Sequence, residues 1–186
     1  MPTPALHPTN VSPEDYLHFE MNTPMRHEFV DGAIYAMSGA SDRHGLVAGA
    51  FFARLFDRVA LGCQVFAFNM KLRISDGPAV VYYYPDVLVS CAADDRDRYF
   101  REKPVLLVEV ISPSTERIDR TEKLAAYKRI SGLIEYVIAE QDMPKVEVLR
   151  RANAWQGEVY LPGASFHLDS IGLEFSIEDI YRRLGF

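Results

Sequence analysis

The sequence predicts an α/β domain in which helices pack on a β-sheet of mixed strand direction. Residues 42–61 carry the longest helical pattern in the chain, with apolar residues recurring at spacings of three and four. Three strand-like runs follow at residues 64–74, 79–90 and 104–112. A second helical pattern at 116–131 then leads into a further strand. Helices and strands in this order are typical of a sheet covered by helices.

The chain begins with an arm and a short helix. Residues 1–11 contain three prolines and no periodicity, which predicts an arm ahead of a single domain at 12–186. Ser12 and Pro13 mark a helix start, because serine caps free backbone N–H groups and proline suits the first turn. This helix is expected to end near Met21–Pro24.

A hairpin and the long helix come next. Residues 27–37 predict two strands joined at Asp31-Gly32, which is a strong turn signal. Ser41 is the expected cap of the helix at 42–61. The glycines and small residues of that helix suit close packing on a sheet.

The middle of the chain supplies the predicted centre of the sheet. Residues 104–112 are apolar on both faces, which is typical of a central strand covered on two sides. Pro85 interrupts the run at 79–90, and proline donates no N–H to a neighbouring strand. We therefore expect that strand to bend or to lie at an edge near Pro85. A charged loop at 93–103 joins the two runs.

The C-terminal part adds short elements. A strand at 134–139 follows the second helix, and a turn at 142–144 leads to a strand at 145–150. Ser176 is the expected cap of a final short helix. The sheet should therefore carry extra β-hairpins at both ends.

Composition narrows the classes of function. The 186 residues have a net charge of −6, which argues against a generally basic nucleic-acid binder but leaves open an enzyme that cuts nucleic acid at a metal site. Cys63 and Cys91 cannot form a disulfide framework, and neither belongs to a metal-binding cluster. No signal-like segment and no apolar run of about 18 residues is visible, so we expect a cytoplasmic protein with no membrane partner.

Several common catalytic motifs are missing from the sequence. It has no GxSxG elbow, no GxxxxGK[ST] phosphate loop and no GxGxxG turn. Its five histidines are scattered without metal-ligand spacing. Any catalytic residues must therefore lie outside these common motifs.

Two carboxylates embedded in apolar strands are the first candidates. Alternation puts Glu109 on one face with Leu107 and Ile111, where a charge is costly unless it is paired or bound to a metal. Asp86 follows Pro85, where the strand should open. On neighbouring strands the two acids would converge on one cation, and oxygen ligands are what Mg²⁺ prefers. The alternative is that each carboxylate pairs with an arginine or a lysine.

Lys123 is the second candidate, and its spacing allows two interpretations. In a regular helix it would form an exposed pair with Asp119 one turn earlier, which carries no chemistry. The short loop at 112–115 also joins the Glu109 strand directly to this helix, so Lys123 could lie over the end of that strand.

These residues, taken together and in order, match a known family. The matching positions are Tyr84-Pro85-Asp86, Val108 to Thr115, Asp119, Lys123, Tyr127 and Glu135-Tyr136, with Glu28 to Gly32, Ser38 to Ser41 and His44 upstream. From about residue 12 to about residue 150 the chain resembles the Uma-two-type restriction endonucleases of the PD-(D/E)XK nuclease superfamily.

The resemblance implies a restriction-endonuclease-like core and a metal-dependent endonuclease. Asp86, Glu109 and the carbonyl of Val110 would hold Mg²⁺, with Mn²⁺ as a substitute, and the substrate would be nucleic acid, with DNA as the expected polymer. One position departs from the superfamily, because the usual lysine is replaced by Ile111. The resemblance implies that Lys123 takes over its catalytic role.

The remaining candidates have structural alternatives. Glu28 would be a further acid near the metal or an exposed strand glutamate. His44 is expected at the surface or as a helix cap, although a supporting role at the site is open. Tyr127 would support the site or fill the core, and the core is favoured.

Assembly and alternative functions complete the expectations. A homodimer is expected because one site cuts one strand, with Phe51-Phe52 or the C-terminal hairpins as the apolar contact. The alternatives are an inactive nuclease-fold binding or regulatory module and a metal-dependent hydrolase of a small phosphate ester.

Overall fold

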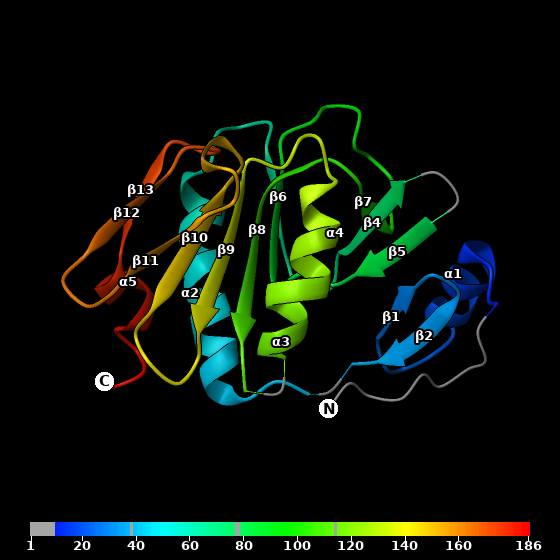
Figure 1. Ribbon diagram of the computed structural model, residues 1–186, viewed down its shortest axis with the longest axis horizontal. Helices are drawn as coiled ribbons and strands as arrows, with labels where there is room; N and C mark the ends of the chain where they lie inside the picture. Colours follow the sequence, from blue (N-terminus) through cyan, green and yellow to red (C-terminus); the bar gives the residue numbers. More distant parts are fainter. Residues whose placement is uncertain (1–9, 38, 77–78, 114) are drawn as a thin grey trace.

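A computed structural model describes residues 10–37, 39–76, 79–113 and 115–186. Most of the predicted N-terminal arm, together with Ser38 and Ser114 of the family pattern, lies outside the described residues. The chain forms a mixed α/β structure with helices on two sides of a central sheet and hairpins at both ends, as the sequence predicts (Figure 1).

The main sheet has six strands in the order β11-β10-β9-β8-β6-β3, with β8 and β9 parallel and the other neighbours antiparallel. Its strands are β3 (Gln64–Ala67), β6 (Val87–Ser90), β8 (Pro104–Ile111), β9 (Glu135–Glu140), β10 (Val146–Arg150) and β11 (Gly157–Tyr160). The apolar run predicted as the central strand is β8, which is buried between β9 and β6.

A second sheet has five strands in the order β2-β1-β5-β4-β7. Its strands are β1 (His27–Val30), β2 (Ala33–Ala36), β4 (Lys71–Asp76), β5 (Ala79–Tyr83) and β7 (Phe100–Arg101). A separate C-terminal hairpin is formed by β12 (Ser165–Leu168) and β13 (Leu173–Ser176).

Helices cover both faces of the main sheet. In Figure 1, α2 (Asp42–Arg58) lies behind it, and α3 (Glu116–Ile118) and α4 (Leu124–Lys128) lie in front. The other helical segments are α1 (Pro13–Met21), a π-helical turn η1 (Asp119–Lys123), a 3₁₀ turn η2 (Arg151–Asn153) and α5 (Ile177–Tyr181). None of the described helices is long and apolar enough to cross a membrane.

Two apolar cores hold these layers together. On the α2 side, Phe51 and Leu55 pack with Val89 and Val108 of the sheet. On the α4 side, Tyr127 packs with residues of β8 and β9 and with residues of the second sheet. Phe51 is fully buried in the first core, so the idea that Phe51 presents an exposed apolar contact is wrong.

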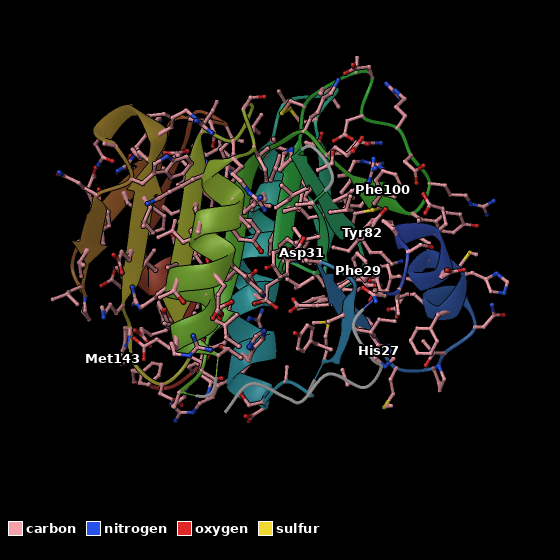
Figure 2. The ribbon with its side chains drawn as sticks, turned by 45° about the vertical axis from the view of Figure 1, so that its right-hand side comes forward. His27, Phe29, Asp31, Tyr82, Phe100 and Met143 are labelled. Atoms are coloured by element: carbon pink, nitrogen blue, oxygen red, sulfur yellow. A yellow bond between two sulfur atoms is a disulfide. The ribbon has the colours of Figure 1, made fainter. Side chains whose placement is uncertain are left out.

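A third, aromatic cluster attaches α1 to the second sheet. Tyr16 of α1 lies 5.1 Å from both Phe29 and Tyr82, measured between ring centroids. Figure 2 shows Phe29, Tyr82 and Phe100 gathered beside α1. The Tyr16 hydroxyl also donates a hydrogen bond to the carbonyl of His27 at the start of β1. The predicted helix start is confirmed, since Ser12 accepts from the backbone of Asp15.

Two of the predicted strands are each divided between the two sheets. The run at 64–74 becomes β3 and β4, and the run at 79–90 becomes β5 and β6. The second break falls at Pro85, where a bend was predicted. The first falls at Phe68, whose φ of 61° turns the chain out of the main sheet. The sequence carries no proline or glycine that announces this break.

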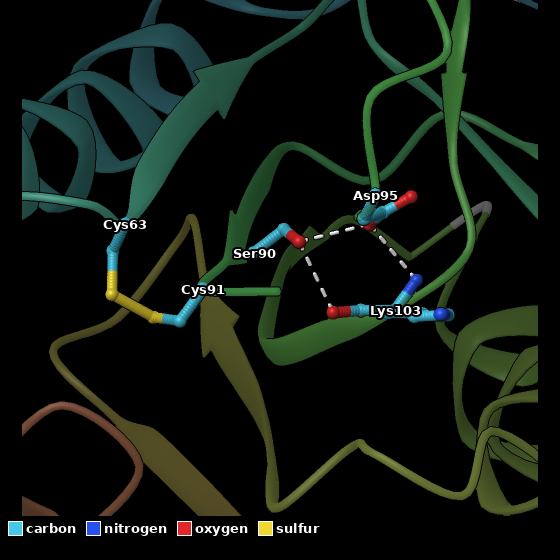
Figure 3. Close-up of a disulfide and its surroundings, with 5 residues drawn as sticks. All are labelled: Cys63, Ser90, Cys91, Asp95 and Lys103. Atoms are coloured by element: carbon cyan, nitrogen blue, oxygen red, sulfur yellow. Dashed lines mark hydrogen bonds between the residues drawn. A yellow bond between two sulfur atoms is a disulfide. The ribbon is translucent and has the colours of Figure 1, made fainter. Parts of the chain in front are cut away.

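Two further differences from prediction lie near the edge strand β3. The long helix ends at Arg58 instead of residue 61, because the chain becomes extended at Val59 and reverses at Gly62, whose φ is 111°. Cys63 and Cys91, for which no framework was expected, form one disulfide (Figure 3). Their neighbours Gln64 and Ser90 are paired residues of β3 and β6.

The charged loop at 93–103 is organised by one buried carboxylate. Asp95 accepts hydrogen bonds from the Ser90 hydroxyl and from the backbone N–H of Lys103 (Figure 3). It also accepts one from the backbone N–H of Glu102. These bonds fix the loop that leads from β6 into β8.

Candidate active site

The ends of β6 and β8 bring the two predicted acids together. Val87 is paired with Val108, so continuing the antiparallel register by one residue places Asp86 opposite Glu109. The carboxylate of Asp86 is fixed in this position because Oδ2 accepts a hydrogen bond of 2.8 Å from the backbone N–H of Val110. Asp86, the residue just before β6, therefore lies beside Glu109 of the neighbouring strand β8.

The carboxylate of Glu109 is held by side chains on the α4 side of the main sheet. Its Oε1 accepts hydrogen bonds from Lys123 Nζ at 3.0 Å and from the Tyr127 hydroxyl at 2.7 Å. The side chain points to the α4 face with Leu107 and Ile111, as alternation predicts. Both donors reach the same oxygen, and Oε2 takes no part in these two bonds.

Lys123 contacts three carboxylates with one ammonium group. Besides Glu109, Nζ lies 3.2 Å from Asp119 Oδ1 and 3.3 Å from Glu28 Oε1. The residue is only 8% exposed. The pair with Asp119 that the helical spacing predicts is present, but it is buried and shared rather than exposed and isolated.

Asp119 and Lys123 begin and end a π-helical turn. The segment predicted as one regular helix contains η1 between α3 and α4. A π turn is wider than an α turn and is frequent at functional sites. Asp119 and Lys123 are the two buried residues of this turn.

His44 joins the site through Asp86. Ser41, rather than His44, caps α2, because its hydroxyl accepts from the backbone of His44. The imidazole Nε2 of His44 instead lies 2.7 Å from Asp86 Oδ1. The interpretation of His44 as a surface or capping residue is therefore wrong, and both oxygens of Asp86 have partners.

Burial and crowding of acids shift the ionisation of the site. Burial is the main cause that raises the pKa of Glu109 to about 8; the charges of Asp119 and Asp86 add to it, and Lys123 opposes it. Burial alone would lower the pKa of Lys123, but Glu109, Glu28 and Asp119 hold it well above its ordinary value. The lysine is therefore charged, and Glu109 takes up a proton more readily than an exposed glutamate.

These side chains line one cavity of about 1220 Å³. The six candidate residues that contribute side chains come together here. Five of them line the cavity directly, namely Glu28, His44, Asp86, Glu109 and Lys123, and Tyr127 lies behind Glu109. Tyr127 is both a core residue and a partner of the site, which joins the two interpretations of it.

The carboxylate of Glu28 has an oxygen that accepts no hydrogen bond from the described residues. Its Oε1 is buried and receives no hydrogen bond from the described residues, although Lys123 Nζ lies 3.3 Å away. The side chain is mostly buried rather than exposed. A buried acceptor in this position has capacity for one more cationic or protonated partner.

The donor set fits a hard divalent cation. Asp86 and Glu109 offer carboxylate oxygens on one side of the cavity, and Glu28 adds a buried oxygen that accepts no hydrogen bond. No group of three or more such side chains in the described part of the chain is arranged to enclose a metal by itself. A cation at this place would need water or other oxygen ligands to complete its coordination.

The residues at the rim of the cavity are not predicted by the sequence. Arg26, Phe68 and Arg117 line it, but they lie in segments without a motif. Asp119 was expected as a family-matching position and as a helical neighbour of Lys123, but not as a lining residue of the cavity. No pattern in the sequence signals these contacts, because they depend on the two sheets meeting.

Comparisons with known proteins identify the family and the fold of the chain. A family model described as "Uma2: Putative restriction endonuclease" matches residues 13–178. Two proteins of Synechocystis sp. (strain ATCC 27184 / PCC 6803 / Kazusa) are similar to the chain. "Uncharacterized protein slr1290" is 34% identical over 95% of this chain and 94% of its own length. "Uncharacterized protein sll1609" is 30% identical over 72% of this chain and 76% of its own length.

A solved structure has the same fold. It is described as a putative nuclease belonging to DUF820 from Anabaena variabilis ATCC 29413. The TM-score is 0.74, with 19% sequence identity, and the match covers 94% of this chain and 99% of the other. At this identity the likeness concerns the fold.

Proposed function

Because this chain belongs to the Uma2 family, we propose that it is a Mg²⁺-dependent endonuclease that hydrolyses phosphodiester bonds in DNA and acts in the cytoplasm. The observation that carries the proposal is the 3.0 Å contact of Lys123 Nζ with Glu109 Oε1, buried beside Asp86 in one cavity. Charged groups that are buried and crowded in a cleft are typical of catalytic sites.

Asp86, Glu109 and the carbonyl of Val110 would hold the cation. When bound, Mg²⁺ supplies a water of lowered pKa and neutralises charge on the phosphate. His44 and the Val110 N–H restrain the Asp86 carboxylate, and Tyr127 restrains Glu109. These hydrogen bonds orient the ligands, which is the usual task of groups just outside a metal site.

Lys123 would stabilise the charge that develops on the phosphate and orient the attacking water. Its ammonium is buried, charged and fixed by three acceptors, so little reorganisation is needed during the reaction. The lysine reaches the site from the helix that follows β8, which allows Ile111 to occupy the superfamily's usual lysine position.

A cleavage assay tests this function. Plasmid and single-stranded DNA are incubated with the protein and Mg²⁺, Mn²⁺ or EDTA, and the products are separated on a gel. Asp86→Asn and Glu109→Gln should each lower the rate by roughly 10²-fold or more, the scale for losing a catalytic group. Asp57→Asn, an exposed acid on α2, is the matched control and should cleave like the wild type.

Cleavage that persists in EDTA, or that is unchanged in both site variants, would contradict the proposed function. Isothermal titration with Mn²⁺ gives an independent readout. The wild type and Asp57→Asn should bind the ion, and Asp86→Asn should bind it more weakly.

A further inference from the structure

Phe68 has an unusual conformation at the wall of the cavity. It lies in the turn between β3 and β4, its φ is 61°, and it is 36% exposed. A left-handed backbone is unfavourable for a bulky residue, and such conformations cluster at ligand sites. Phe68 also lines the cavity that contains Asp86 and Glu109.

The backbone of Phe68 is fixed from both sides by site elements. Its N–H donates a hydrogen bond of 3.1 Å to the carbonyl of Asp86. Its own carbonyl accepts a hydrogen bond from the guanidinium of Arg26. The position of the aromatic residue is therefore coupled to the position of the catalytic acid.

The rim beside Phe68 combines apolar surface with one positive charge. Met25 is 58% exposed and lines the same cavity. Among the described residues, Arg26 forms no ion pair with a carboxylate, whereas Arg117 pairs with Glu122 and Lys123 pairs with three acids. Arg26 is thus the cavity-lining guanidinium available to a phosphate.

The balance of charge in the cavity disfavours binding through many phosphates. The acids that line it are Glu28, Asp86, Glu109, Asp119 and Glu122, and they outnumber the lining arginines and lysine. A duplex bound by its backbone needs several cationic contacts. Stacking of a base on an aromatic ring supplies binding energy without such contacts.

We infer that Phe68 is a stacking site for one unpaired nucleobase, and that Arg26 contacts the adjoining phosphate. This inference rests on the proposed nuclease function and names the form of its substrate as single-stranded or locally unpaired DNA. An aromatic face accepts a base only when that base is not paired within a duplex. The scissile phosphate then lies toward Asp86 and Glu109.

Binding without cleavage tests the stacking site. Fluorescence anisotropy is measured in EDTA with a labelled oligo-dT strand and with the matching dT·dA duplex. The single strand should bind more tightly than the duplex. Phe68→Ala should weaken single-strand binding roughly 10-fold, the loss for about one stacked base, while Phe68→Trp should retain it. Phe56→Ala removes a phenylalanine that is 67% exposed on α2, and it should bind like the wild type.

The outcomes separate this inference from the proposed function. A wild type that cleaves DNA while Phe68→Ala binds the single strand unchanged would overturn the stacking site and leave the nuclease standing. Equal weakening by Phe68→Ala and Phe56→Ala would also overturn it. In the cleavage assay the inference requires Phe68→Ala to raise KM with kcat nearly unchanged, because stacking acts equally on bound substrate and transition state. A wild type that neither binds nor cleaves DNA would overturn both.

Discussion

Lys123 is the residue whose replacement best separates chemistry from structure. Lys123→Met should lower phosphodiester cleavage by roughly 10²-fold or more, because it removes the only charged donor to Glu109 Oε1 among the described residues. Asp119→Asn keeps the lysine and two of its carboxylates, so its kinetic effect should be much smaller. The measurement is the rate with Mg²⁺ for each variant.

The fold of both variants must be checked by circular dichroism. Lys123 is buried among acids, so its removal also costs stability, and the assay should be run well below the unfolding temperature of each variant. Equal rates for the wild type and folded Lys123→Met would remove the catalytic role of the lysine and leave Asp86 and Glu109 as a metal pair.

Glu109 gives the metal-free protein a distinctive pH dependence. Its pKa is about 8 in the folded chain against an ordinary value of 4.5, so between these values the folded state binds a proton that the unfolded state lacks. The free energy of unfolding should therefore fall as pH rises from about 5 to about 8, by up to roughly 1.4 kcal/mol per pH unit. Urea unfolding in EDTA at several pH values measures this slope.

Glu109→Gln provides the comparison, because glutamine does not titrate. The difference in unfolding free energy between wild type and Glu109→Gln should change steadily through this pH window. A constant difference from pH 5 to pH 8 would show that Glu109 titrates as an ordinary glutamate.

At the residue scale, alternation and chain order were enough to place the acids. Glu109 lies on the predicted face with Leu107 and Ile111, and Asp86 follows the bend at Pro85. The contact between His44 and Asp86 was not predictable, because it joins the first turn of a helix to a distant strand end. A single sequence contains no signal for such a contact.

At the level of elements, the turn at Phe68 predicts an inverted order of stability. A protein with alanine at a given position is normally more stable than one with glycine there. At a φ of 61°, however, any residue with a Cβ is destabilised relative to glycine. Phe68→Gly should therefore be more stable than Phe68→Ala by about 1 kcal/mol, although both lack the ring. Thermal unfolding of the two variants measures the difference.

Asp57, on an exposed helical position of α2, supplies the control pair. Asp57→Gly should be less stable than Asp57→Ala, which is the usual order in a helix. The same order at Phe68 would mean that the backbone there is not held in the left-handed region.

The boundaries of the helices and strands show which features of the fold a local sequence pattern predicts and which it does not. The sequence predicts the helix caps at Ser12, Ser41 and Ser176, and all three are confirmed because capping depends only on nearby residues. The π turn at Asp119–Lys123 was missed, because its periodicity over one turn is indistinguishable from that of an α-helix. The division of two runs between two sheets depends on packing far from the breaks.

At the scale of the whole molecule, we propose a homodimer through β11. This strand is an edge of the six-stranded sheet, and Val159 and Leu161 in and beside it are about half exposed. Edge strands that expose apolar residues tend to pair with another chain. Light scattering should give the mass of a dimer, and Val159→Lys should give a monomer.

Asp57→Lys adds the same residue type far from that edge and should leave the dimer intact. A wild-type monomer at micromolar concentration would exclude the dimer, and a dimer that survives Val159→Lys would move the contact to another surface.

The site is assembled from parts that are distant in the chain. Glu28 comes from the second sheet, Asp86 and Glu109 from the main sheet, and Lys123 from the helical layer, yet the ammonium contacts both sheets' acids. Contacts of such long sequence separation carry a large cost in loop-closure entropy, which must be met before the contacts stabilise the fold. A partly folded chain can therefore contain either sheet without containing the assembled candidate site. Under the proposed function, a newly synthesised chain would cleave DNA only after its last tertiary contacts form.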